Sequence, residues 1–120
     1  MPLTLTSAQS PVTVYPGQQF KLFDGTETVA ALLKSVTVQL GKERPASPPS
    51  QQLFTVTFAS APTATVLIQG SNDDVDGHYQ TLATLTTITG YYADLGEFAY
   101  YRAYLSVYSA GGMPTVLLQR

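Results

Sequence analysis

Cysteine and tryptophan are both absent from this chain of 120 residues. Without cysteine the protein has no disulfide, no thiol nucleophile and no thiolate metal site, so its fold must be held by packing and by contacts between chains. Charged residues are also scarce, at 12% of the chain against roughly 25% in ordinary soluble domains. The surface must therefore be covered mainly by uncharged threonine, serine, glutamine and tyrosine side chains.

Positive charge is scarcer still. Lys and Arg together number 6, the formal net charge is -2, and no basic run occurs. Binding to nucleic acid requires clustered Lys and Arg that neutralise phosphates, so this class of partner is excluded. A nearly neutral surface also gives little electrostatic repulsion between copies, which predicts a protein that associates with neighbours.

Long apolar runs are missing as well, since no window approaches the roughly 18 apolar residues of a membrane span. The N-terminus, MPLTLTSAQSPV, has neither the basic start nor the continuous apolar stretch of a secretory signal. We therefore expect a soluble protein that is made in the cytoplasm and has no membrane partner.

Apolar and polar residues alternate through several short segments, which is the pattern of half-buried strands. Examples are 12–14, 36–40 and 54–58, and the more continuously apolar Thr63–Gln69 is predicted to be a central strand. Pro and Gly separate these segments at turns, and the chain length suits one domain. The sequence predicts an all-β, single-domain antiparallel β-sandwich over residues 1–120. We expect a jelly-roll-like arrangement, which the local pattern does not separate from other sandwiches.

Three segments depart from this pattern. Thr28–Lys34, TVAALLK, is compatible with a helix and is predicted to form a short one. Residues 42–52, KERPASPPSQQ, contain three prolines and are predicted to form an exposed loop. This loop is either a solvated connector or an arm that reaches a neighbouring subunit. Residues 1–10 are a candidate N-terminal arm.

Asn72–Gly77, NDDVDG, matches the first half of a calcium-binding loop, with oxygen-bearing side chains followed by glycine. The twelfth position, where such a loop needs a bidentate glutamate, is Ala83. A hairpin loop in which Asn, Asp and Gly adopt left-handed backbone angles is therefore the favoured interpretation. Calcium binding stays an open alternative, and no cofactor is expected.

Catalytic groups are sparse. His78 is the single histidine, and neither a Gly-x-Ser-x-Gly motif nor a cysteine accompanies it, whereas a hydrolytic triad needs a nucleophile, a base and an orienting group. The acidic residues are scattered over separate turns, so a pair of catalytic carboxylates would depend on tertiary coincidence. The sequence predicts a protein that is not an enzyme. The scattered acids are Asp24, Glu27, Glu43, Asp94 and Glu97.

Phe98–Tyr108 is predicted to be an aromatic strand with two different faces. One face contains Tyr101, Ala103, Leu105 and Val107, and the other contains Tyr100, Arg102, Tyr104, Ser106 and Tyr108. Tyr and Arg are enriched in interface cores, so the second face is a candidate partner surface. The alternative, which we favour slightly, is that these rings cover the flank of the sandwich and Arg102 pairs with an acid such as Asp94.

Tyr91 and Tyr92, with the tyrosines around Tyr100, are also candidates for a carbohydrate-binding platform, because aromatic faces stack on sugar rings. The absence of tryptophan makes this the second choice. The candidate interface residues are Tyr91, Tyr92, Tyr100, Arg102, Tyr104 and Tyr108.

Five segments in the second half of the chain form a recognisable succession. They are VLIQGSND (66–73), 79–85, 92–95, YYRA (100–103) and 114–118. Their order is a strand, a Gly-Ser-Asn-Asp turn, a strand that follows a tyrosine, and an aromatic strand with Tyr-Arg-Ala. This succession resembles the small β-sandwich structural proteins of tailed bacteriophage virions. The pattern is also similar to discoidin-like and jelly-roll sandwiches.

The resemblance implies a virion component without enzymatic activity: a head decoration, or cement, protein on the capsid exterior, made in the bacterial host cytoplasm. Its partners would be the major capsid protein and other copies of itself, as a homotrimer or dimer. Sandwich edges at Leu3–Ser7 or Thr115–Gln119 are candidates for strand addition between subunits. The alternative is a carbohydrate- or receptor-binding module associated with the tail or baseplate.

Overall fold

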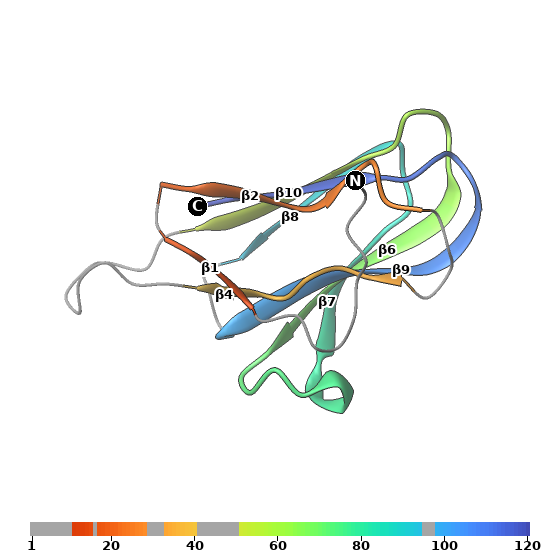
Figure 1. Cartoon of the computed structure of the whole chain (residues 1–120). Coiled ribbons are helices and arrows are strands. Elements are labelled where there is room, and N and C mark those ends of the chain that lie inside the picture. The colour runs from red at the N-terminus through yellow and green to blue at the C-terminus, as the bar shows by residue number, and fades with distance from the viewer. Residues whose placement is uncertain (1–10, 16, 29–32, 41–50, 95–97) are drawn as a thin grey trace.

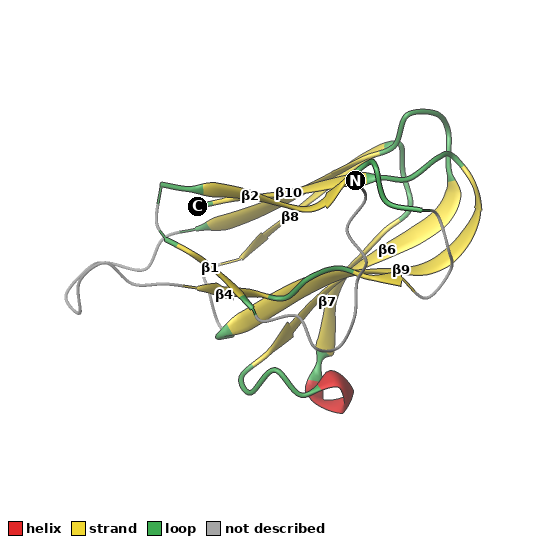
Figure 2. Cartoon of the chain, in the orientation of Figure 1, coloured by secondary structure: helices red, strands yellow, loops and turns green. Residues whose placement is uncertain are grey.

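The computed structural model describes residues 11–15, 17–28, 33–40, 51–94 and 98–120. Within these ranges the chain forms ten strands in two sheets that pack face to face, with one 3-10 turn (Figures 1 and 2). This confirms the predicted all-β sandwich. The elements are β1 (Val12–Val14), β2 (Gln19–Asp24), β3 (Leu33–Lys34), β4 (Val38–Leu40), β5 (Gln52–Thr57), β6 (Thr63–Ser71), η1 (Asp76–His78), β7 (Gln80–Leu85), β8 (Thr89–Asp94), β9 (Tyr100–Ala110) and β10 (Thr115–Gln119).

The four-stranded sheet has the order β2-β10-β5-β8, and each neighbouring pair is antiparallel. β10 lies inside this sheet, with Val116 and Leu118 fully buried. The prediction that Thr115–Gln119 is an exposed edge is therefore wrong, because β2 and β5 occupy its two sides. The other predicted edge, Leu3–Ser7, lies outside the described residues.

The six-stranded sheet has the order β1-β4-β9-β6-β7, and β3 also pairs with β9. β6 lies between β9 and β7, which confirms the predicted central strand Thr63–Gln69 (Figure 1). β1 and β4 are parallel, and the other pairs of this sheet are antiparallel.

Leu33 and Lys34 form β3 rather than the end of the predicted helix Thr28–Lys34. They pair with two residues of β9, and Ser35 continues this contact. The Ser35 N–H donates to the Ala103 carbonyl at 2.8 Å, and the Ser35 Oγ accepts the Ala103 N–H at 2.8 Å. Pairing with β9 outweighs the weak helical preference of so short a segment. The middle of the predicted helix lies outside the described residues.

The strand pairs are nested along the chain. β2 pairs with β10, β3 and β4 pair with β9, β5 pairs with β8, and β6 pairs with β7. The chain therefore runs out to the β6–β7 hairpin and returns, and each returning strand pairs with an outgoing one (Figure 1). This brings the C-terminus to the start of β2, where the Arg120 N–H donates to the Gln18 carbonyl at 3.0 Å.

The hydrophobic core lies between the two sheets. Phe54, Val56 and Phe58 are buried, as their alternation with polar residues predicts. The Phe54 ring lies 5.4 Å from that of Tyr101, centroid to centroid, so the two sheets meet through aromatic contacts. The buried members of the core are Val14, Leu22, Phe23, Val38, Phe54, Val56, Phe58, Ala64, Val66, Ile68, Tyr101, Ala103, Leu105, Val116 and Leu118.

A β-bulge in β9 reverses the alternation in its second half. The pairing with β6 passes over Ser106, which is the extra residue of the bulge. Beyond it, Val107 is 54% exposed and Tyr108 packs against the core. The predicted faces of this strand are therefore correct as far as Leu105, but wrong for Val107 and Tyr108.

Two predicted segments are covered only in part. Residues 1–10, the candidate arm, and residues 42–50 of the predicted proline-rich loop 42–52 lie outside the described residues. The end of that loop was wrongly predicted, because Gln52 is the first residue of β5, pairs with Asp94 and is 1% exposed. In the part of the chain that is described, no helix has the length and apolar character needed to span a membrane.

Gly70 in β6 is expected to tolerate no side chain. A Cβ at this position would lie 2.7 Å from Cδ2 of Phe98 and 3.1 Å from Cδ1 of Leu82. Gly70→Ala is therefore expected to lower the free energy of unfolding by about 1–3 kcal/mol through overpacking. Urea denaturation measures this change.

Gly77→Ala is the matched control, because a Cβ at Gly77 would meet no atom within 4 Å. Its free energy of unfolding should stay within about 0.5 kcal/mol of the wild-type value. Equal stability of the two variants would contradict the close packing of Phe98 against β6.

Candidate functional site

A buried arginine is the most unusual side chain of the six-stranded sheet. Arg102 lies on β9 with its side chain 9% exposed, on the side opposite the buried Tyr101 and Ala103. Its Nε donates to Gln69 Oε1 at 2.8 Å, and its Nη1 donates to Asp76 Oδ1 at 2.6 Å. A buried charge is costly unless it is paired and hydrogen-bonded, and these two bonds meet that requirement.

Tyr79 covers the same guanidinium group. Its ring centroid lies 4.0 Å from Cζ of Arg102, which is a cation–π contact. The Tyr79 hydroxyl donates to Asp74 Oδ1 at 2.6 Å and lies 3.3 Å from Thr37 Oγ1. Burial and the bond to Asp74 both raise the pKa of the Tyr79 hydroxyl, so it remains a protonated donor at neutral pH.

Lys34 brings a second cation to the site. Its Nζ lies 2.9 Å from Asp76 Oδ1 and 5.3 Å from the centroid of the Tyr104 ring. The hydrogen bond from Lys34, followed by that from Arg102, holds the pKa of the Asp76 carboxyl below its ordinary value. We name Lys34, Gln69, Asp76, Tyr79 and Arg102 the Arg102 cluster.

The Arg102 cluster fastens the β6–β7 connection to the sheet. Asp76 belongs to η1 and Tyr79 follows it, while the cations that contact them come from β3 and β9. Asp74 has a positive φ of 53°, a left-handed conformation that aspartate tolerates in turns. The end of this hairpin is therefore held by side chains from separate strands as well as by its own turn.

A second set of contacts stabilises the same connection from within. Asp73 Oδ1 accepts the Ser71 hydroxyl at 2.9 Å, and Oδ2 lies 2.5 Å from Nδ1 of His78. The bond with His78, followed by that from Ser71, lowers the pKa of the Asp73 carboxyl. The imidazole contacts the carboxylate rather than the serine hydroxyl, so these three residues lack the serine–histidine bond of a hydrolytic triad.

The three aspartates of the predicted calcium-loop segment Asn72–Gly77 contact different protein groups. Asp73 contacts Ser71 and His78, Asp74 accepts from Tyr79, and Asp76 accepts from two cations. The segment joins β6 to β7, as the hairpin interpretation predicts. Among the described residues, no group of three or more His, Cys, Asp or Glu side chains is placed to hold a metal ion.

Arg102 pairs with an acid, as one of the two interpretations predicts, but Asp94 as the example of that acid was wrong. Arg102 binds Asp76, whereas Asp94 accepts the hydroxyl of Tyr101 at 2.7 Å. Asp94 ends β8 in the other sheet and is 7% exposed. Tyr101 points into the core toward it, so Arg102, the next residue, points away. Burial, reinforced by the bond to Asp94, raises the pKa of the Tyr101 hydroxyl.

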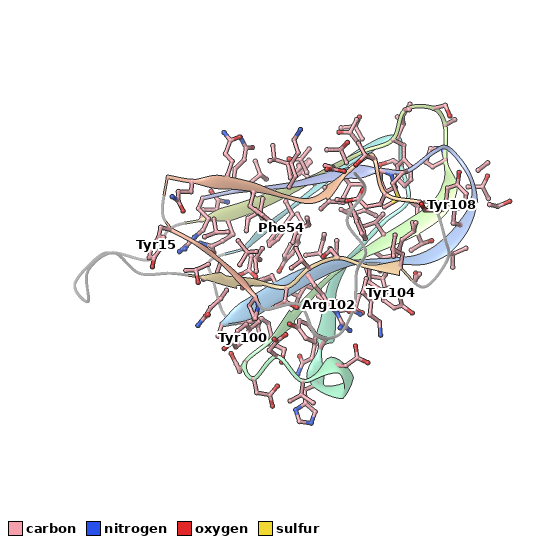
Figure 3. The ribbon with its side chains drawn as sticks, viewed as in Figure 1. Tyr15, Phe54, Tyr100, Arg102, Tyr104 and Tyr108 are labelled. Carbon is pink, nitrogen blue, oxygen red and sulfur yellow. The ribbon has the colours of Figure 1, made fainter. Side chains whose placement is uncertain are left out.

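The six candidate interface residues do not share one face. Tyr100, Arg102 and Tyr104 alternate with the buried residues of β9, while Tyr108 packs against the core (Figure 3). Tyr91 and Tyr92 lie on β8 of the other sheet. Their exposure to solvent also differs.

Tyr91 is 73% exposed and presents an open ring, but Tyr92 stacks on Phe54 with 6.2 Å between ring centroids. Adjacent residues of a strand point to opposite faces, so the two tyrosines cannot form one platform. Of this pair, Tyr91 alone is placed to stack on a ligand.

Sequence reasoning singled out Arg102 but not the residues that bind it. Its partners Gln69 and Asp76 are 33 and 26 positions away, and Lys34 lies 42 positions from Asp76. No motif spacing connects such distant residues. The one local signal was the cluster of aspartates before Gly77, which was interpreted as a turn or a calcium loop.

No protein family model matches the chain, and no significant similarity to a curated protein or to a solved structure was found.

Arg102→Leu is expected to lower the free energy of unfolding by about 1.5–3 kcal/mol, because charge-assisted hydrogen bonds to Gln69 and Asp76 are lost. Arg102→Lys keeps the charge but not the two-directional fork, so it should recover only part of this loss. Urea denaturation measures stability, and hydrogen exchange of amides 73–79 reports release of the hairpin end.

Lys34→Met is the control, since this exposed ion pair contributes less than about 1 kcal/mol. Unchanged stability and unchanged exchange in Arg102→Leu would show that Arg102 does not hold the connection.

Asp76→Asn is expected to change how stability depends on pH. The hydrogen bonds from Lys34 and Arg102 hold the folded-state pKa of Asp76 below its ordinary value, so its ionised form stabilises the fold above that ordinary pKa and the contribution is lost as pH falls through the folded pKa. The variant should be less stable than wild type at neutral pH, and the gap should close at acid pH. Thermal unfolding between neutral and strongly acid pH tests this, and a gap that does not change with pH would refute it.

Proposed function

We propose that this chain is a non-enzymatic structural protein of a tailed bacteriophage virion. In this proposal it is made in the bacterial host cytoplasm and decorates the capsid exterior. There it binds the major capsid protein and stabilises the assembled head, and neither nucleic acid nor membrane is a partner. The sequence resemblance in 66–118 motivates this proposal, and the fold is compatible with it.

We also propose that the sandwich is a jelly roll. The nested pairs β2–β10, β4–β9, β5–β8 and β6–β7 support this topology, because they describe one long hairpin folded over into two sheets. Jelly rolls recur in viral capsid proteins and in lectins. The topology therefore agrees with the proposed virion role and also with the sugar-binding alternative.

The observation that carries the decoration proposal is an uncharged outer face on β10, β5 and β8, three strands of the four-stranded sheet, beside β2, which carries Lys21 and Asp24. Every outward-facing residue of β5, β8 and β10 lacks charge, and the strands pair in a regular register, for example Leu117 with Thr55 and Thr55 with Tyr91. The members of this uncharged face are Leu53, Thr55, Thr57, Thr89, Tyr91, Ala93, Thr115, Leu117 and Gln119.

Such a face suits a protein surface as its partner. Interface cores are depleted in charge, as this face is, and enriched in tyrosine, which this face offers at Tyr91 on its β8 side. The cations of the Arg102 cluster are bound to Asp76 in the β6–β7 connection, which belongs to the other sheet. Broad, neutral contact is what a subunit needs to lie on a shell rather than to select a charged ligand.

The mechanism is mass action. A subunit that binds only the assembled lattice stabilises it by its free energy of binding, and many copies repeat this contribution. Association of the subunit into a homotrimer or dimer adds avidity, since several weak contacts are then held at once.

Thr55→Lys tests this proposal, because it places a charge at the centre of the uncharged face. Wild-type protein should co-sediment saturably with undecorated capsids and raise their melting temperature. Thr55→Lys should bind at least about tenfold more weakly, equivalent to about 1.4 kcal/mol. Val107→Lys, at an exposed position of the other sheet, is the control and should bind as wild type does.

A wild-type protein that fails to sediment with capsids would overturn the decoration role. A Thr55→Lys variant that is folded and binds normally would instead remove the uncharged face as the contact.

A tail- or baseplate-associated carbohydrate- or receptor-binding module is the second candidate, and the open ring of Tyr91 favours it. A host polysaccharide should then bind saturably to wild-type protein, and Tyr91→Ala should abolish binding while Tyr104→Ala leaves it unchanged. Calorimetric titration of the polysaccharide distinguishes the two variants. The absence of binding to any host glycan would contradict this candidate.

A further inference from the structure

Apart from the two-residue β3, which pairs only with β9, four strands form the sheet edges in the described part of the chain: β1 and β7 in one sheet, β2 and β8 in the other. Exposed edges present unpaired backbone groups that invite pairing with another chain, and proteins usually protect them. Protection takes the form of short strands, proline, charged residues or bulges. The four edges differ in whether they have such protection.

Three of the edges carry such protection. β1 has three residues and follows Pro11. β2 carries Lys21 and Asp24, and its pairing contains a register shift. The pairing of β7 with β6 also contains a register shift, between Ile68 and Gln69. These features oppose the regular addition of a further strand.

β8 has none of these protective features over Thr89–Ala93. This stretch contains neither a charged residue nor proline, and its pairing with β5 runs over six residues without a register shift. Its central residue, Tyr91, is 73% exposed and is the most exposed of the large hydrophobic residues of the described chain. Over Thr89–Ala93, β8 is thus a regular and uncharged edge.

The direction of its backbone groups follows from one hydrogen bond. The Phe58 N–H donates to the Ile88 carbonyl at 2.8 Å, so Ile88 faces β5. Hydrogen-bonded and non-hydrogen-bonded pairs alternate in an antiparallel ladder. The backbone groups of Thr89, Tyr91 and Ala93 therefore point away from β5. The Thr89 carbonyl agrees with this, since it accepts the Thr87 hydroxyl at 2.7 Å.

We propose that β8 pairs antiparallel with β8 of a second copy of this chain, around a two-fold axis at Tyr91. The outward groups at Thr89, Tyr91 and Ala93 are spaced evenly about Tyr91. A two-fold axis at that point places Tyr91 opposite its counterpart and Thr89 opposite Ala93, with about six backbone hydrogen bonds between the copies. The two four-stranded sheets become one continuous sheet of eight strands.

The absence of charge on this edge favours its pairing with a second copy of itself. A two-fold contact sets the residue at the axis opposite its own copy, so a charge there would repel itself, whereas the uncharged Tyr91 does not. The Tyr91 rings then become cross-strand neighbours, a pairing that stabilises sheets. The uncharged face also becomes continuous across the two copies. The proposal goes beyond the decoration role and does not rest on it.

The test uses the purified full chain alone, so its outcome is separate from that of the capsid experiment. Analytical ultracentrifugation over a concentration series should show a reversible change from the 12.9 kDa chain to a dimer. Tyr91→Lys should raise the dissociation constant at least about tenfold, because two like charges meet at the axis. Gln19→Lys, which adds the same charge to the β2 edge, should leave the dissociation constant unchanged.

Hydrogen exchange locates the contact even if a variant folds poorly. In wild-type protein the amides of Thr89, Tyr91 and Ala93 should become protected as concentration rises, while those of Gly90 and Tyr92, which face β5, are protected at every concentration. A protein that stays monomeric at its solubility limit would overturn the proposal. So would a trimer, or a dimer in which these three amides gain no protection.

Discussion

Strand β9 and its pairing with β6 are the constraint on which the rest of the structure depends. β9 is the longest of the described strands, and it pairs with β3, β4 and β6. Its inward residues Tyr101, Ala103 and Leu105 are fully buried in the core. On its other side, Arg102 holds the β6–β7 connection through Asp76. One strand therefore joins the hydrophobic core to the polar cluster that fixes the hairpin end.

The few charged residues of the protein are unevenly placed. Two of the described cations, Lys34 and Arg102, both bind Asp76 in the β6–β7 connection, and Lys21 lies on β2 at the edge of the four-stranded sheet, whereas the outer face of β5, β8 and β10 has no charge. Water can solvate hydroxyl groups there, but a neighbouring protein can cover them at low desolvation cost. The uncharged face of β5, β8 and β10 is the basis for proposing a protein that functions against other subunits.

The sequence predicted those features that depend on local pattern. Alternation at Phe54–Phe58 identified a strand and its buried face, and the apolar run Thr63–Gln69 identified a central strand. Features set by distant partners were missed. The bulge at Ser106 turns Tyr108 inward, and β10 is an interior strand rather than an edge. Arg102 binds Asp76 rather than Asp94. Each of these features depends on which strand lies alongside. Of the candidate site, the sequence located Arg102 and Tyr91 but not the Arg102 cluster.

Cryo-electron microscopy of capsids decorated with this protein tests the central claim most directly. The account predicts density for the sandwich on the outer capsid surface, with the uncharged face of the four-stranded sheet against the shell and the β6–β7 hairpin away from it. Capsids without bound density, or a bound sandwich whose uncharged face points to solvent, would contradict it.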